Sequence, residues 1–313
     1  MSGKSIYDDV MLTKVNVAGV HIRRRESRAV VFNGDRKLIF KSTNIGANYH
    51  SAKNEGVIAV LDKLFKDFDI KSIDCLCLGV AGCDREKEVI ELEDHLASYV
   101  KNSMVYNNGV IALVGASGKM LSEESAVLVE ADTGAVAVGV NRKGELMRSG
   151  GWGYIIGDEG GAFDIGKSAL IHAAKAHDGI ETNSIDKEVV NFLSLRNFSD
   201  LIDLYDTSDP VSYVAALFPL VCELADKDKT AEVILEKGAT ALADLVKTLS
   251  KKLHIEGEAA LYEEGRVFED GNYRKRFESK LENFLTKQPK HGPEVGAAML
   301  AFEKLTEKFK ELE

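Results

Sequence analysis

The sequence predicts an α/β protein built of two similar lobes. Three observations point to this class. The chain has 313 residues, about twice the length of a typical domain; short apolar runs alternate with stretches of helical periodicity; and the strand pattern restarts near residue 125. With 45% hydrophobic and 29% charged residues, 27 Gly and only 4 Pro, the composition is that of a globular protein and excludes a disordered or collagen-like chain.

The first lobe is predicted to begin with three strands and to continue with helices that alternate with buried strands. Asn33-Gly34 is typical of a hairpin turn between the second and third strands. The run IDCLCLGVAG is apolar almost throughout, as a central parallel strand covered on both faces would be. In chain order the predicted elements are strands 15–19, 28–33 and 37–41, helix 53–68, strand 73–82, helix 86–100 and strand 104–106.

The second lobe repeats the order of the first. AVVFNGDRKLI from Ala29 and AVGVNRKGELM from Ala137 both place an apolar strand, an Asn-led polar turn and a second short strand in sequence, which indicates an internal duplication. The predicted elements are strands 126–129, 135–140, 145–147 and 258–262, and helices 209–225, 230–253, 272–285 and 293–313. We expect one lobe of residues 1–115 with the C-terminal helix 293–313, and a second of residues 116–292 with a helical extension, flanking a ligand-binding cleft.

Charge and cysteine content narrow the function classes. Forty basic and fifty acidic residues give a net charge of −10, which disfavours nucleic acid and anionic membrane surfaces as partners. The four cysteines show no CxxC spacing and no partnering His cluster, so we expect reduced thiols and no metal site. The N-terminus lacks a signal-peptide core and no stretch of eighteen apolar residues occurs, so a cytoplasmic protein is expected.

The densest glycine cluster, SGGWGYIIGDEGGAFDIGKSAL at residues 149–170, is the candidate ligand-binding segment. Glycines at this density suggest tight turns and close approach of backbone to a ligand. Asp158 and Glu159 could accept hydrogen bonds from polyol hydroxyls. The alternative for the whole segment is an irregular strand-to-helix connection that binds nothing. Residues 161–168 also match the P-loop pattern GxxxxGK[ST], but Phe163, Asp164 and Ile165 fill its interior. We therefore expect a glycine-rich turn that leads into an amphipathic helix.

This segment resembles the GGWG…GDEGS signature of the N-acetylglucosamine kinase family and the related BadF/BcrA-type ATPases, which belong to the actin, Hsp70 and sugar-kinase superfamily. Further segments fit in the same order along nearly the whole chain: GANYHS, GVAGCDRE, NNGVIAL, ADTGA and PEVGAAMLAF. The resemblance implies two duplicated βββαβαβα lobes of the ribonuclease H-like, actin-like fold, with ATP, Mg²⁺ and a sugar in the cleft. It also leaves a homodimer open, since relatives often dimerise.

The resemblance assigns the sugar side to residues that this chain retains. They are Asn48, the turn Gly150, Gly151, Trp152 and Gly153, and Asp158 with its neighbour Glu159. An amide can donate and accept, a carboxylate can take two hydroxyl protons, and Trp152 can pack against an apolar sugar face. For Asn48 alone, a simple turn residue is the alternative.

On the nucleotide side the resemblance implies Gly19, Thr133, Gly134 and Gly265 as binding residues, but the surrounding positions depart from the family. Ala18 stands near the place of the Mg²⁺-ordering Asp, with Arg23, Arg24 and Arg25 in the following turn. The position of the catalytic Asp is Asn108, Asp132 enters the second phosphate loop, and Glu263 and Glu264 enter the adenosine loop. An Asn amide cannot take the proton of an attacking hydroxyl.

The sequence therefore predicts a protein similar to N-acetylglucosamine or hexose kinases, with ATP-dependent phosphotransfer weak or lost and sugar binding retained. ATP and Mg²⁺ are implied by the resemblance, and the departures place both in question. Two alternatives stay open. One is an active kinase whose base is a neighbour such as Asp132 or Asp158, and the other is a non-enzymatic dimer or partner scaffold.

Overall fold

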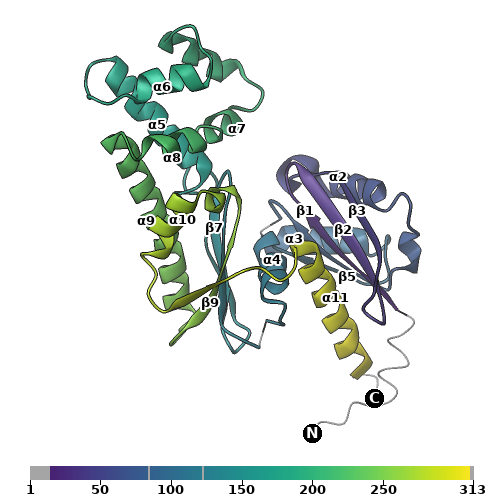
Figure 1. The fold of residues 1–313 in the computed structure, drawn as a ribbon. Helices are drawn as coiled ribbons and strands as arrows, with labels where there is room; N and C mark the ends of the chain where they lie inside the picture. The colour runs from purple at the N-terminus through teal and green to yellow at the C-terminus, as the bar shows by residue number, and fades with distance from the viewer. Residues whose placement is uncertain (1–14, 84, 122, 311–313) are drawn as a thin grey trace. The chain divides into compact units, whose positions relative to one another are not determined.

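The computed structural model describes residues 15–83, 85–121 and 123–310, and the N-terminal segment examined for a targeting signal lies outside this range. The chain divides into two compact units, one of Met1–Glu124 with Gln288–Glu313 and one of Ser125–Lys287 (Figure 1). The sequence placed these borders after residues 115 and 292. Residues 288–292 fall in the first unit because the N–H groups of Lys290 and His291 donate to the carbonyls of Ala116 and Gly115 at 3.0 and 3.1 Å.

Unit 1 contains a five-stranded sheet in the order β3-β2-β1-β4-β5. Strands β1, β4 and β5 run parallel, whereas β2 pairs antiparallel with both β1 and β3. The strands are β1 (Asn16–Ile22), β2 (Glu26–Asn33), β3 (Leu38–Ile45), β4 (Cys75–Val80) and β5 (Ser103–Tyr106). The helices are α2 (Tyr49–Leu64), α3 (Glu86–Leu96), α4 (Asn108–Ser117) and α11 (Pro293–Lys310), with a 3₁₀ turn η1 (Ile70–Ser72). The predicted strands, the turn at Asn33 and the buried parallel strand are confirmed.

Helices cover both faces of this sheet. Helices α4 and α11 pack together against β1 and β4, and α2 and α3 pack together on the other strands (Figure 1). Gly19 is necessary for the first contact, because a Cβ there would lie 1.9 Å from the Glu294 carbonyl oxygen of α11. Helix α4 is apolar and almost wholly buried; it begins with an Asn107 cap and ends at Gly118 in the left-handed conformation. Burial of Cys75, Cys77 and Cys83 agrees with the expected thiols, while Cys222 of unit 2 is half-buried.

Unit 2 repeats the sheet of unit 1, with the strand order β10-β9-β6-β7-β8. The strands are β6 (Ala126–Ala131), β7 (Ala135–Val140), β8 (Leu146–Gly150), β9 (Ala259–Glu264) and β10 (Phe284–Lys287). The helices are α5 (Ala162–His177), α6 (Ile185–Phe192), α7 (Pro210–Ala215), α8 (Phe218–Leu224), α9 (Lys229–Lys252) and α10 (Gly271–Glu278), with 3₁₀ segments η2 (Phe198–Asp206) and η3 (Arg266–Glu269). Reversed, this order matches that of unit 1, which confirms the predicted duplication.

Two predictions for unit 2 are wrong in detail. The helix expected over 272–285 ends at Glu278, and residues 284–287 instead form the edge strand β10, parallel to β9. The helix expected over 209–225 is interrupted between α7 and α8, where Pro219 stands in the first turn of α8. A proline is compatible with a first turn but lacks the N–H that a continuous helix would require.

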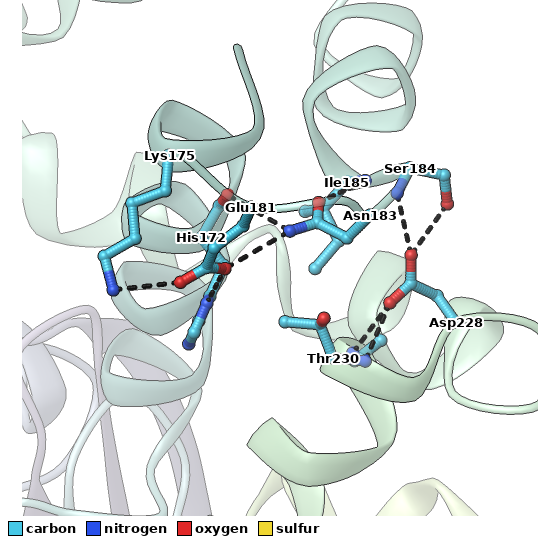
Figure 2. Close-up of polar contacts among 9 residues, drawn as sticks. His172, Lys175, Glu181, Asn183, Ser184, Ile185, Asp228 and Thr230 are labelled. Atoms are coloured by element: carbon cyan, nitrogen blue, oxygen red, sulfur yellow. Dashed lines mark hydrogen bonds and ion pairs between the residues drawn. The ribbon is translucent and has the colours of Figure 1, made fainter. Parts of the chain in front are cut away.

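Two carboxylates link segments of the helical part of unit 2 (Figure 2). Glu181 accepts from the His172 ring at 2.6 Å and from the Lys175 ammonium at 3.0 Å, which ties the end of α5 to the segment before α6. Asp228 caps α9 and also accepts from the N–H and hydroxyl of Ser184 at 2.8 and 2.9 Å. Because donors from the chain surround both groups, we assign this network to stability. Within the described residues, no helix has the length and apolarity to span a membrane.

Candidate functional site

The candidate site in unit 1 lies where its parallel strands end. In register, His21 of β1 stands beside Gly79 of β4, and Gly79 stands beside Tyr106 of β5. The carboxyl ends of these three strands therefore meet at one edge of the sheet, the usual ligand-binding edge of α/β sheets. Helix α4 starts at the same edge with Asn108.

Asn108 ties this edge together. Its Nδ2 donates to the Ile22 carbonyl at 3.2 Å, and that carbonyl also accepts from the N–H of Ala81 at 2.9 Å. Its Oδ1 is buried without a hydrogen-bond partner, and a Cβ on Gly79 would lie 2.9 Å from it. The side chain at the predicted base position is thus a neutral amide that donates one of its two N–H groups to the end of β1.

The end of β1 carries a histidine. The strand predicted over 15–19 continues to Ile22, three residues further, so Ala18 is fully buried inside it and His21 is its last residue but one. Burial, followed by the charges of Arg23 and Arg28, lowers the pKa of His21 to about 3. The imidazole is therefore neutral at physiological pH.

Gly19 also lies within β1, and its missing side chain is explained by the packing of α11 against the strand. Contact of Gly19 with a nucleotide stays a prediction. The turn that follows the strand holds Arg23, Arg24 and Arg25, the last two exposed.

Asn48 stands at the same edge as the N-cap of α2. Its Oδ1 accepts from the N–H of His50 at 3.0 Å, and Gly82, at φ +79°, packs its backbone against the amide. The Tyr49 N–H donates to the Ala81 carbonyl at 2.8 Å, which fixes the helix start against the end of β4. Asn48 therefore has the turn role considered as its alternative, and its Nδ2 is the group that could donate to a ligand.

In unit 2 the glycine-rich segment forms a turn after β8. Gly150, Gly151 and Gly153 all have φ between +72° and +87°, a region that other residues rarely adopt. Trp152 is 64% exposed, with the Arg148 guanidinium 5.0 Å from its ring centroid. The turn thus presents an exposed aromatic ring with a guanidinium group over one of its faces.

Asp158 links this turn to the loop between β6 and β7. Its Oδ1 accepts from the Gly153 N–H at 3.2 Å, and its Oδ2 would lie 2.2 Å from a Cβ on Gly134. Burial raises the pKa of Asp158 against the effect of its backbone hydrogen bonds, with a further rise from the exposed Glu159. A half-buried carboxylate therefore stands directly on Gly134, beside Thr133.

The β6–β7 loop is also tied to the segment that follows β9. Arg266 donates to Asp132 at 2.7 Å, so the negative charge that the sequence placed in this loop has a cationic partner. Gly265, at φ +109°, brings the backbone so close to β6 that a Cβ would lie 2.0 Å from the Ala131 carbonyl oxygen. The two predicted nucleotide loops of unit 2 therefore contact each other.

Glu263 turns toward α10. It forms an ion pair with Arg274 at 2.6 Å, and its side chain is 4% exposed. Burial raises its pKa to about 7, with the carboxylate of Glu278 adding to the rise and Arg274 opposing it. This side chain is thus occupied by a contact within unit 2.

Comparison with known proteins identifies the family of the chain. The model of the BadF/BadG/BcrA/BcrD ATPase family matches residues 26–301. The chain belongs to this ATPase family. It is 31% identical over 304 residues to the N-acetyl-D-glucosamine kinase of Dictyostelium discoideum, covering 88% of this chain and 94% of the relative. It is 29% identical over 266 residues to an N-acetylmuramic acid/N-acetylglucosamine kinase of Clostridium acetobutylicum, covering 77% of this chain and 86% of the relative.

Solved structures confirm the actin-like sugar-kinase fold. A Chromobacterium violaceum structure described as an N-acetylglucosamine kinase superposes with a TM-score of 0.73 at 18% identity, covering 92% of this chain and 99% of that one. A glucokinase of the ROK family from Streptomyces griseus, solved with glucose and AMPPNP, gives 0.55 at 14% identity, covering 92% of this chain and 99% of that one. At these identities the likeness shows the fold alone.

The ATPase family implies ATP and a divalent cation, but the strand-end residues of unit 1 do not fit Mg²⁺. Mg²⁺ prefers carboxylate, phosphate and water oxygens in octahedral geometry. Among the residues that the structure describes, this edge holds His21, Asn48 and Asn108, and Arg23, Arg24 and Arg25 stand in the turn that follows β1. No group of three or more His, Cys, Asp or Glu side chains that could hold a metal ion occurs in the part of the chain that the structure describes.

The P-loop alternative is excluded. Helix α5 begins at Ala162 with Gly161 as its N-cap, so residues 162–168 are helical and cannot form a phosphate loop. The expected glycine-rich turn leading into a helix is confirmed.

Sequence reasoning did not single out two residues of the candidate site. His21 was hidden by the extension of β1 beyond the predicted end, and Arg266 is 134 positions from its partner Asp132. No local signal marks the pair of Arg266 and Asp132, because it depends on the parallel pairing of β6 with β9.

Proposed function

We propose that this member of the BadF/BadG/BcrA/BcrD family binds a hexose or amino sugar and transfers phosphate to it weakly or not at all. The observation that carries this proposal is Asn108, at the position where the family resemblance puts a catalytic Asp. Its amide cannot accept a proton, and its Nδ2 is engaged by the Ile22 carbonyl. Loss of a positioned base typically lowers a rate by about 10²- to 10⁴-fold.

The neutral His21 supports the same conclusion. Phosphoryl transfer depends mainly on positioning and on neutralising charge with Mg²⁺, and this strand end supplies no carboxylate to order the ion. Base and metal functions are therefore affected together at one edge of the sheet.

Sugar binding is supported by the polar groups that remain. Asn48 has a donor in its Nδ2, Asp158 has a half-buried carboxylate, and Trp152 has an exposed ring. Amide, carboxylate and aromatic face are the groups that hold polyols in proteins. The relatives named as N-acetylglucosamine kinases point to an N-acetylhexosamine as the first ligand to test.

A coupled ADP-release assay with Mg-ATP and a panel of hexoses and N-acetylhexosamines tests the loss of transfer. We expect turnover at least about 100-fold below the 1–100 s⁻¹ of ordinary kinases. Calorimetry with the same sugars tests binding. Asp158→Asn should weaken it, whereas Glu256→Gln, an exposed acid in the segment before β9, should not. Ordinary turnover would overturn the first half of the proposal. The absence of heat with every sugar would overturn the second half and favour a non-enzymatic scaffold. Light scattering tests the homodimer that the resemblance leaves open.

One observation favours the alternative function, an active kinase in which another residue replaces the catalytic base. Asp158 has a raised pKa and lies on Gly134 of the predicted phosphate loop, whereas Asp132 is held by Arg266. Asp158 is therefore the better candidate for that role. If the wild-type protein turns over, loss of more than 100-fold in kcat on Asp158→Asn with sugar binding preserved would establish it; loss of binding with kcat retained would assign Asp158 to sugar binding.

A further inference from the structure

A histidine stands beside the amide of Asn48 at the ligand-binding edge of unit 1. His50 lies in the first turn of α2, two residues after the Asn48 N-cap, and its side chain is 57% exposed. A Cβ on Gly82 would lie 3.0 Å from Asn48 Nδ2 and 3.1 Å from His50 Cδ2, so both side chains face the same glycine. The imidazole of His50 is therefore a neighbour of the amide that the proposed sugar site uses.

The opposite side of the imidazole faces a buried carboxylate. His50 Nδ1 lies 3.7 Å from Glu88 Oε1, and the Glu88 side chain is 6% exposed. Glu88 is fixed at the start of α3, because its Oε2 accepts from the Arg85 N–H at 3.2 Å and its Oε1 accepts from Arg85 Nε at 2.9 Å. A negative charge held on this side favours the tautomer of His50 that carries its proton on Nδ1.

This arrangement leaves Nε2 of His50 for a ligand. Nε2 is bonded to Cδ2, the ring atom that faces Gly82, whereas Nδ1 lies across the ring. Within the described residues no hydrogen bond is made to Nε2, and with the proton on Nδ1 this nitrogen is an acceptor. Asn48 Oδ1 already accepts from the His50 N–H, so Asn48 offers its Nδ2 as a donor. The edge thus presents one donor beside one acceptor.

A purely structural role accounts poorly for this histidine. The contact with Glu88 links α2 to α3, but a pair with one partner more than half exposed and 3.7 Å between its atoms contributes little to stability. A donor beside an acceptor instead matches two neighbouring hydroxyls of a polyol, one of which accepts while the other donates.

We propose that His50 is a further sugar-binding residue, whose Nε2 accepts a hydrogen bond from the sugar hydroxyl next to the one that Asn48 Nδ2 holds. Glu88 is its positioning residue, because its charge keeps the proton on Nδ1 and leaves Nε2 as the acceptor. The inference rests on the proposed function and adds a requirement for two adjacent hydroxyls on the sugar.

Calorimetry on the full chain tests this contact with N-acetylglucosamine, or the sugar of the panel that binds more tightly, and with its monodeoxy analogues. His50→Phe keeps a flat aromatic ring but removes both nitrogens, and it should lower the affinity for the parent sugar at least tenfold, equivalent to about 1.4 kcal/mol. The analogue that lacks the contacted hydroxyl should bind wild type and His50→Phe within about twofold of each other. The matched control His95→Phe, an exposed histidine in the last turn of α3, should leave every affinity unchanged.

Glu88→Gln tests the positioning role. It removes the charge beside Nδ1 and nearly keeps the size of the side chain, so we expect it to weaken sugar binding in the wild-type background. In the His50→Phe background it should have no effect on affinity, because Glu88 acts through the imidazole. A loss of equal size in both backgrounds would assign Glu88 to structure alone and overturn its positioning role. Circular dichroism and melting temperature check that each variant is folded.

Two outcomes would overturn the role of His50 while leaving sugar binding in place. One is an unchanged affinity of His50→Phe for the parent sugar, and the other is an equal loss with the parent sugar and every analogue. An absence of heat from wild type with every sugar of the panel would overturn the proposed function, and this inference with it. Binding by wild type therefore distinguishes the two failures.

Discussion

Replacing Asn108 with Asp restores the residue type of the predicted base and should destabilise unit 1 without restoring activity. The Nδ2 that now donates to the Ile22 carbonyl at 3.2 Å becomes an oxygen that faces another oxygen. Losing the hydrogen bond costs about 1 kcal/mol, and leaving a buried charged oxygen unsatisfied costs about 1–3 kcal/mol more. We therefore expect a loss of about 2–4 kcal/mol in the free energy of unfolding at pH 7.5.

The loss should depend on pH in a defined direction. Burial against a carbonyl raises the pKa of the new carboxyl above its unfolded value of about 3.9, so the folded state holds its proton more tightly. The penalty is absent below the unfolded pKa, where a protonated Asp can donate to Ile22, and it is complete above the folded pKa. Urea unfolding at pH 4 and pH 7.5 should show the variant near wild type at the lower pH and destabilised at the higher.

Asn107 provides the matched control one residue away. Its Oδ1 caps α4 by accepting from the Gly109 N–H at 2.8 Å, and an Asp carboxylate can accept the same bond. Asn107→Asp should therefore keep wild-type stability at both pH values. Equal stability of Asn107→Asp and Asn108→Asp at pH 7.5, or a gain of more than tenfold in ADP release by Asn108→Asp, would refute this account of the strand-end edge.

Three further changes test the packing of unit 2. Gly134→Ala should lower the free energy of unfolding by about 1–3 kcal/mol in urea titrations, because the new Cβ would lie 2.2 Å from the Asp158 carboxylate; stability equal to wild type would mean that this carboxylate moves away freely. Tyr273→Phe removes the buried hydroxyl that donates to the Gly160 carbonyl at 2.7 Å, and a loss of about 1–3 kcal/mol is expected by the same measurement, whereas an unchanged midpoint would argue against the bond. Glu263→Gln should gain in melting temperature relative to wild type as pH rises from 5 to 8. The reason is that a folded pKa of about 7 makes the wild-type protein lose stability as this buried carboxyl ionises. A difference in melting temperature that is independent of pH would contradict that pKa.

Much of the fold could be predicted because its strands are short apolar runs with strong local signals. The run that became β4 is buried at every position, and the similar segments after Ala29 and Ala137 became the matching hairpins of two sheets with the same strand order. Edge strand β10 could not be predicted in this way. Its four residues, FLTK, place two apolar side chains before two polar ones, so the sequence does not alternate although the burial does. Their structure depends on pairing with β9, for which the local sequence holds no signal.

The residues of the candidate site could be predicted from the sequence, but the contacts that they make within the chain could not. Asn108, Asn48 and Asp158 were identified from the segments around them, and all three lie at strand ends or in turns. The ion pair of Arg266 with Asp132 depends on the parallel pairing of β6 with β9, which brings the ends of two distant strands together. The charge of a loop therefore could not be judged from its own residues.

At the positions that the resemblance assigns to the nucleotide, the two units depart from the family pattern with charges of opposite sign. In unit 1 the strand end holds a neutral His21 followed by three arginines, and no carboxylate takes the place of the metal-ordering Asp. In unit 2 an acid has entered the phosphate loop, and Arg266 neutralises it from within the chain. A cation is bound where carboxylates gather, and an anion where guanidinium groups do. The proposed loss of phosphate transfer therefore rests on two separate changes, the missing carboxylate at the strand end of unit 1 and the neutralised acid in the loop of unit 2.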